Sequence, residues 1–168
     1  NLLDHMDGLT SGVAALAGGA FLAIAIQTGQ PQVALLLAPL VGACLAFLVF
    51  NFAPAKIFLG DAGSLFIGFW LACLTVQFTF YESHYPRYTY LVPLAVLAVP
   101  LYDTAGVLLI RLIQRRPLFQ GDTSHLAHRL AALGLSRRQA VLTVYALTLF
   151  TGFSAVLLYQ VQTLGAVL

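Results

Sequence analysis

Five long apolar segments constrain the fold of this chain more than any other feature of its sequence. They cover approximately residues 11–26, 33–50, 65–80, 91–110 and 140–159. A helix of about 20 residues crosses the hydrocarbon core of a bilayer, so each segment can span a membrane once the shorter ones extend into their flanks. Only 8% of the 168 residues are charged, against about 25% in soluble domains, which excludes an ordinary water-soluble protein.

Helix is the secondary structure that these segments predict. A backbone in lipid must satisfy its own hydrogen bonds, and the alternation typical of membrane strands is absent from the sequence. We therefore predict an all-α polytopic membrane protein with about five transmembrane helices, forming one transmembrane domain over residues 1–168. Ser136 and Gln139 form a capping-box pattern before the last helix. Because Asn1 already begins a motif-like stretch, we expect the chain to be the C-terminal part of a larger protein.

The distribution of basic residues predicts the orientation. Five crossings would place the N-terminus, residues 51–64 and residues 112–139 on one side of the membrane. All of the basic residues except Arg87 fall on that side: Lys56, Arg111, Arg115, Arg116, Arg129, Arg137 and Arg138. By the positive-inside rule this face is predicted to be cytoplasmic. The net charge of +2 is too small to suggest a nucleic-acid partner.

The first polar motif is NLLDHMDGL at residues 1–9. If this stretch is helical, Asp4 and Asp7 lie three positions apart and share a face. Two carboxylates and the Asn1 amide can hold Mg²⁺, which prefers a few carboxylates together with water and phosphate oxygens. The carboxylates can also act as a base or bind substrate hydroxyls. The alternative is a solvated helix start, where Asp is favoured.

The second motif is NFAPAKIFLGDAGS at residues 51–64. Its two glycines allow a tight turn around Asp61, and Ser64 can cap the helix that follows. Lys56 can bind a phosphate or serve only as a topology charge. A plain loop with a helix cap is the alternative interpretation.

The third motif is DTSHLAHRL at residues 122–130. His125 and His128 lie three positions apart, and Arg129 adds a fixed cation suited to phosphate. A zinc site is a weaker hypothesis, because cysteines and a plain third ligand are missing. A basic interfacial helix is the other alternative.

Asp103 lies within the fourth apolar segment. A carboxylate at this depth is expensive in lipid, so it is a functional candidate unless neighbouring helices satisfy it. Pro93 and Pro100 are expected to bend this helix. A transporter or channel using Asp103 is the alternative function, although such proteins place ionisable groups in several helices. A purely structural membrane subunit would explain the hydrophobicity but not three Asp/His motifs on one face.

Taken together, the carboxylates, cations and histidines at one membrane face suit a diphosphate substrate. With these motifs in this order, the chain resembles the polyprenyl-phosphate N-acetylhexosamine-1-phosphate transferases, which include phospho-MurNAc-pentapeptide translocase. The resemblance covers essentially the whole chain. Residues 51–64 are its most specific part, and residues 122–130 resemble the UDP-GlcNAc branch.

The resemblance implies transfer of a sugar 1-phosphate, GlcNAc-1-phosphate above all, from a UDP-sugar to undecaprenyl phosphate, with release of UMP. It implies Mg²⁺ as the cofactor, with Mn²⁺ as an alternative, and a bacterial inner-membrane enzyme whose site faces the cytoplasm and starts an envelope polysaccharide such as lipopolysaccharide or teichoic acid. A homodimer stays open. Catalytic roles fall on Asp4, Asp7 and Asp61, metal binding on Asp61 and Asn1, and substrate binding on Asn1, Lys56, His125, His128 and Arg129.

Three departures from the family pattern matter. The paired aspartate that family members carry on an earlier helix is absent from these residues, so the chain alone is expected to be inactive. Ala127 stands where many relatives carry another histidine. His5 stands where Gly or Asn is commoner, and it is expected either to contact substrate or to be neutral variation.

Overall fold

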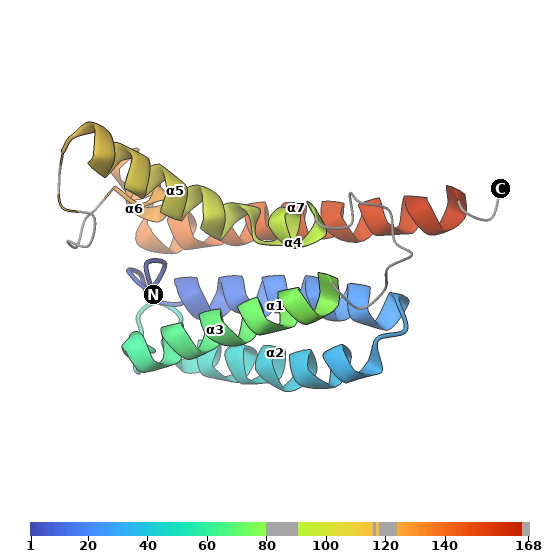
Figure 1. The fold of residues 1–168 in the computed structure, drawn as a ribbon. Coiled ribbons are helices and arrows are strands. Elements are labelled where there is room, and N and C mark those ends of the chain that lie inside the picture. The colour runs from blue at the N-terminus through green and yellow to red at the C-terminus, as the bar shows by residue number, and fades with distance from the viewer. Residues whose placement is uncertain (80–90, 116, 118–123, 166–168) are drawn as a thin grey trace.

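The computed structural model describes residues 1–79, 91–115, 117 and 124–165, and every regular element among them is a helix. The helices are α1 (Leu9–Gln27), α2 (Pro31–Asn51), α3 (Gly60–Thr79), α4 (Leu91–Val96), α5 (Ala98–Ile113), α6 (Leu126–Ala132) and α7 (Arg137–Gly165). No strand occurs in these described ranges, which confirms the all-α prediction (Figure 1).

The chain passes back and forth along one axis. α1, α2 and α3 alternate in direction, α4 and α5 together return, and α7 runs out again (Figure 1). The N-terminus, the α2–α3 connection and the short helix α6 therefore lie at the same end of the bundle, as the sequence predicted. We call this end the polar end, because the first two sequence motifs and residues 124–130 of the third lie there; residues 122 and 123 are outside the described residues.

Three helices of the described chain are long and apolar enough to cross a membrane: α1, α2 and α7. Large apolar side chains on them face outward, among them Leu35 and Val49 on α2 and Phe150 on α7. Outward-facing apolar side chains suit contact with lipid, which confirms a polytopic membrane protein. The predicted total of about five spans remains a prediction for the other two passes.

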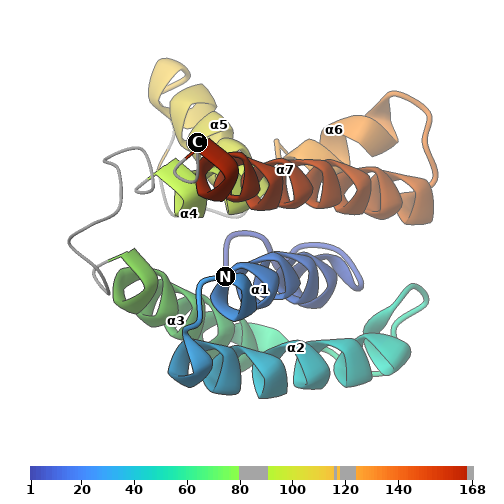
Figure 2. The ribbon, with the colours of Figure 1, turned by 90° about the vertical axis from the view of Figure 1, so that its right-hand side faces the viewer.

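α1 is the central helix. Figure 2 shows it between α2 and α3 on one side and α7 on the other. Most of its length is buried, and its side chains are apolar on every face, as expected of a fully surrounded helix. Phe21 and Ile24 of α1 pack with Leu37 of α2 in the larger apolar cluster.

The fourth predicted span is not one helix. It divides at Leu97 into α4 and α5, so a single helix over residues 91–110 was wrong. Pro100 has no N–H to donate to the carbonyl four residues earlier, which interrupts the hydrogen-bond ladder there. Regular bonds flank the break: the Leu97 N–H donates to Pro93 at 3.0 Å, and the Leu101 N–H donates to Leu97 at 3.0 Å. The segment is thus interrupted close to Pro100, whereas the predicted bend stays a prediction.

The start of α7 is fixed as the sequence predicted. The Ser136 N–H donates to Gln139 Oε1 at 2.8 Å, and the Gln139 N–H donates to Ser136 Oγ at 3.3 Å. This reciprocal pair is a capping box, and it satisfies two backbone donors that the first turn leaves free.

Candidate active site

Asn51, the last residue of α2, ties the second motif to the first. Its Oδ1 accepts hydrogen bonds from the Gly8 N–H at 3.1 Å and from Ser11 Oγ at 3.0 Å. Its Nδ2 donates to the carbonyl of Ile57 at 2.9 Å. The residue is only 6% exposed, so this amide is a buried clamp. The sequence analysis missed the role, although an Asn closing a long apolar segment was a usable signal.

Residues 1–8 form turns, and α1 begins only at Leu9. The condition under which Asp4 and Asp7 would share one helix face is therefore not met. Gly8 has a φ of 77°, a left-handed conformation that redirects the chain just before the helix. Asp7 instead contacts the second motif, because its Oδ2 accepts a hydrogen bond from the Ala55 N–H at 3.1 Å. This bond brings Asp7 beside the loop that carries the exposed Lys56.

Ser64 joins Asn1 to the start of α3. Its hydroxyl lies 3.2 Å from Asn1 Oδ1 and 3.3 Å from the Asp61 carbonyl oxygen. The expectation that Ser64 caps the helix was wrong, because α3 already begins at Gly60. The predicted turn around Asp61 was wrong, because Asp61 and Gly63 lie inside α3, although Gly60 at the helix start has a left-handed φ of 65°. Asn1 and Asp61 are thus neighbours, and the Asp61 carboxylate is exposed in the first turn of α3.

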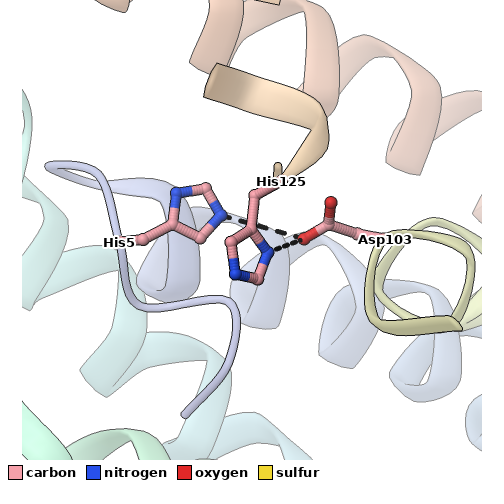
Figure 3. A group of neighbouring side chains, drawn as sticks. All are labelled: His5, Asp103 and His125. Atoms are coloured by element: carbon pink, nitrogen blue, oxygen red, sulfur yellow. Dashed lines mark hydrogen bonds and ion pairs between the residues drawn. The ribbon is translucent and has the colours of Figure 1, made fainter. Parts of the chain in front are cut away.

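Asp103 is the centre of a cluster that includes the third motif. Its Oδ2 lies 2.8 Å from Nδ1 of His125 and 3.8 Å from Nε2 of His5 (Figure 3). Its Oδ1 accepts a hydrogen bond from the Leu126 N–H. Asp103 is 5% exposed and His125 is 4% exposed. The carboxylate therefore has hydrogen-bond partners in neighbouring elements, which is the structural alternative that the sequence analysis gave for Asp103.

His5 stacks within the same cluster. Its ring centroid lies 4.1 Å from that of His125 and 4.8 Å from that of His128. Both ring nitrogens of His5 are buried and lack a hydrogen-bond partner among the described residues. His5 is thus one contact between the N-terminal segment and the residues around the start of α6, a role that the sequence analysis left open.

The zinc hypothesis can be compared with this geometry. Within the described chain, the residues close enough to share a metal ion are His5, Asp103 and His125. His128, which the zinc hypothesis paired with His125, is not in this group. Zn–ligand bonds of 2.0–2.1 Å in a tetrahedron put ligand atoms about 3.3 Å apart. The 2.8 Å contact of His125 with Asp103 is instead a charge-assisted hydrogen-bond length. We therefore treat the pair as hydrogen-bonded.

His128 lines a cavity of about 150 Å³ together with His5, Asp7 and Arg137. The pKa of His128 is lowered from its usual 6.5, and burial is the largest cause. The charges of the neighbouring His5, His125 and Arg137 lower it further, whereas the charge of Asp103 acts in the opposite direction. The imidazole is therefore predominantly neutral at pH 7. A neutral imidazole can accept a proton or donate one hydrogen bond.

A larger apolar groove of about 510 Å³ begins at the same end. Asn1 and Ser64 line its polar mouth, and Ile67 and Leu71 continue it along α3, with Leu101 of α5 among the facing residues. The α3 residues that line it run from Ser64 to Thr75, about 16 Å of helix rise. The groove can therefore hold an elongated apolar group beside a polar head.

The predicted site residues meet only in part. Asn1 lies beside Asp61, Asp7 beside the loop of Lys56, and His125 and His128 beside His5. The carboxylates of Asp4, Asp7 and Asp61 do not form one group that could share an ion in the described chain. Arg129 is exposed on α6. The motifs thus gather at one end but surround a space and do not form a closed cluster.

The fold and site define a polytopic helical membrane protein with a polar site at one end. Residues 1–79 match the sequence model of glycosyl transferase family 4. Over 158 residues, or 94% of the chain, the sequence is 35% identical to a probable undecaprenyl-phosphate N-acetylglucosaminyl 1-phosphate transferase of Bacillus subtilis, of which the match covers 44%. The chain thus resembles glycosyl transferase family 4 over residues 1–79, and the identity of 35% over 94% of the chain confirms the family resemblance.

A second relative matches a shorter part of the chain at higher identity. Over 76 residues, or 45% of the chain, the sequence is 51% identical to the phospho-N-acetylmuramoyl-pentapeptide-transferase of Bacillus cytotoxicus, of which the match covers 24%. The chain spans less than half the length of both relatives. The match to the Bacillus subtilis protein, at 158 of the 168 residues, is long enough that it must include the third motif.

Proposed function

We propose that this protein transfers an N-acetylhexosamine 1-phosphate from a UDP-sugar to undecaprenyl phosphate, with GlcNAc-1-phosphate as the preferred group. The observation that carries the proposal is that three polar motifs meet at one end of an apolar bundle, beside a groove along α3. A water-soluble nucleotide sugar can reach that end from solvent, and a polyprenyl chain can lie among apolar helices. The names of the two relatives support this reaction class.

In the proposed reaction, an oxygen of the lipid phosphate attacks the β-phosphorus of the UDP-sugar. A new P–O bond forms to the lipid phosphate, the bond from the β-phosphorus to the bridging oxygen breaks, and UMP leaves with that electron pair. Catalysis of such transfers depends on positioning and on cations that stabilise the developing charge. Lys56 and Arg129 are the exposed cations assigned to the diphosphate. A covalent route through Asp4 or Asp7 is the alternative.

Mg²⁺ is the proposed cofactor, with Asp61 and Asn1 as its ligands. Mg²⁺ prefers oxygen ligands, and both side chains offer oxygen. Ser64 contacts both residues, and the Asp61 carboxylate is exposed with no protein partner in the described chain. This donor set fits Mg²⁺ better than the imidazoles of His5 and His125 do. When bound there, the ion would neutralise diphosphate charge.

The site is proposed to face the cytoplasm of a bacterial cell, at the inner membrane. The basic residues of the described polar end support this orientation through the positive-inside rule. Arg138, which is exposed at the start of α7, is a suitable reporter. In a protein without other cysteines, Arg138→Cys should react with a membrane-impermeant thiol reagent in inside-out vesicles and not in intact spheroplasts; the opposite pattern rejects the orientation.

UMP release tests the activity directly. Full-length protein with Mg²⁺, undecaprenyl phosphate and UDP-GlcNAc should release UMP, and Asp61→Asn should reduce turnover about 100-fold or more. Cys73→Ser, an exposed position on the same helix, is the matched control and should keep normal turnover. Near-normal turnover of Asp61→Asn in saturating Mg²⁺ would reject the metal role. No UMP from any UDP-N-acetylhexosamine would reject the function.

A further inference from the structure

We infer that Asp103 is a positioning residue that holds the histidine motif of α6 in place over the site. The inference deepens the proposed function and rests on it, since the histidine motif is assigned there to the substrate. Asp103 lies in α5, within the fourth apolar segment. Its partner His125 lies 22 positions later in the sequence, directly before Leu126, the first residue of α6. One carboxylate thus joins two segments that have no regular element in common.

Both oxygens of the carboxylate are used. Oδ2 meets Nδ1 of His125 at 2.8 Å, and Oδ1 accepts the Leu126 N–H at the first residue of α6 (Figure 3). The two bonds fix the ring and the backbone of adjacent residues at once. A buried carboxylate with two charge-assisted hydrogen bonds resists displacement, because moving either partner leaves a buried charge unsatisfied.

The first bond also fixes which nitrogen of His125 carries a proton. A carboxylate only accepts, so Nδ1 of His125 must be the donor. Nε2 then lies on the far side of the ring, away from Asp103 (Figure 3). A His ring whose Nδ1–H is held by a carboxylate presents Nε2 in one orientation to any further partner.

The second bond fixes the direction of α6. His125 precedes the helix with an extended backbone, a ψ of 150°, and its side chain does not cap the helix. The Asp103 carboxylate, which belongs to α5, caps α6 instead by accepting a hydrogen bond from the Leu126 N–H. His128 and Arg129 follow within the first turn, so their positions depend on this contact. Ala127, between them and the contact, is buried against Val141 and Val144 of α7.

Substitutions at Asp103 in the full-length protein test the inference. Asp103→Asn keeps the shape but leaves one acceptor oxygen for two N–H groups, and Asp103→Leu removes both acceptors. We expect kcat to fall about 10- to 100-fold, the range typical of residues that orient a functional side chain. Asp103→Glu should recover part of the loss, because it restores the carboxylate. Tyr102→Phe, at a neighbouring position that is 60% exposed, should change nothing.

Two readouts distinguish positioning from a merely structural role. Asp103→Leu with His125→Ala should be no slower than the slower single variant, because both remove the same arrangement. In protein with ¹⁵N-labelled histidine, the hydrogen-bonded Nδ1–H signal of His125 should be present in the wild type and lost in Asp103→Leu. Fully additive losses, or an unchanged ¹⁵N signal, overturn the inference.

The ¹⁵N signal separates this inference from the proposed function. If wild-type protein releases no UMP, the function fails, yet the ¹⁵N comparison still decides whether Asp103 holds His125. A zinc titration covers the remaining alternative. If Zn²⁺ raises the melting temperature of the wild type and not of Asp103→Asn, the carboxylate is a metal ligand and the positioning role is overturned; an equal response of both proteins to Zn²⁺ supports it.

Discussion

The hydroxyl of Tyr145, on α7, donates a hydrogen bond to the carbonyl oxygen of Gly8, 137 positions earlier in the chain. The same ring covers Gly12, one turn into α1, so closely that a Cβ there would lie 2.0 Å from the hydroxyl oxygen. The last helix therefore holds the start of the central helix directly. Because Gly8 follows the segment that carries Asp4 and Asp7, this contact also supports the site.

Gly12→Ala should destabilise the protein. The added methyl group would meet the oxygen and Cζ of Tyr145 at 2.0 and 2.1 Å, and overpacking of this kind typically costs about 1–3 kcal/mol. Thermal unfolding in detergent measures the loss. Gly19→Ala on the same helix is the matched control, because its Cβ would meet nothing within 4 Å. Equal melting temperatures for the two variants would contradict the close packing of Tyr145.

Tyr145→Phe should have a smaller effect than Gly12→Ala. It removes one hydrogen bond, worth about 0.5–1.5 kcal/mol, while the Gly8 carbonyl keeps the Gly12 N–H as a donor at 3.0 Å. The melting temperature should fall accordingly. Tyr102→Phe, an exposed tyrosine on α5, should leave it unchanged. A loss from Tyr145→Phe that exceeds that of Gly12→Ala would show that the hydroxyl does more than the structure indicates.

Asn51→Asp should destabilise the protein, although the Asn and Asp side chains are nearly the same size. The new carboxylate keeps an acceptor for the Gly8 N–H but replaces the donor that Nδ2 offers to the Ile57 carbonyl, so two acceptors would face each other. An unsatisfied buried polar group costs about 1–3 kcal/mol. Equilibrium unfolding measures the change. Gln32→Ala, at an exposed position on α2, is the control and should be neutral.

His128 should make stability depend on pH. Burial lowers the pKa of His128 in the folded protein below the 6.5 of the unfolded chain. Between the folded-state pKa and the unfolded-state pKa, the unfolded chain therefore binds more protons than the folded protein. The stability associated with neutral His128 is therefore complete above pH 6.5 and is lost as the pH falls toward the folded-state pKa. The melting temperature should drop below pH 6.5, and His128→Gln should flatten that drop. An identical pH profile in both proteins would contradict the assignment.

Sequence periodicity and hydrophobicity were sufficient for the architecture. The apolar segments predicted the helices and their alternating direction, and Ser136 with Gln139 predicted the start of α7. Pro100 marked the irregularity in the fourth segment, but not that it would divide the segment into α4 and α5. A proline removes one specific hydrogen bond, whereas whether the helix then bends or breaks depends on packing around it.

The site was predicted less completely than the fold. The motifs identified residues by type but left the conformation of residues 1–8 open, and Gly8 with its positive φ and the Asn51 clamp impose turns there. The pairing of Asp103 with His125 was not predictable either. It joins residues 22 positions apart across two elements, and no local pattern reports such a contact.

The Asn51 clamp has a consequence for engineering this protein. Because one side chain binds both Gly8 and Ile57, and Asp7 binds Ala55, residues 1–8 and the loop after α2 share one scaffold. A chimera that imports only one of these segments from a relative would separate partners that fit each other. Segment exchange with a relative should therefore transplant both segments together.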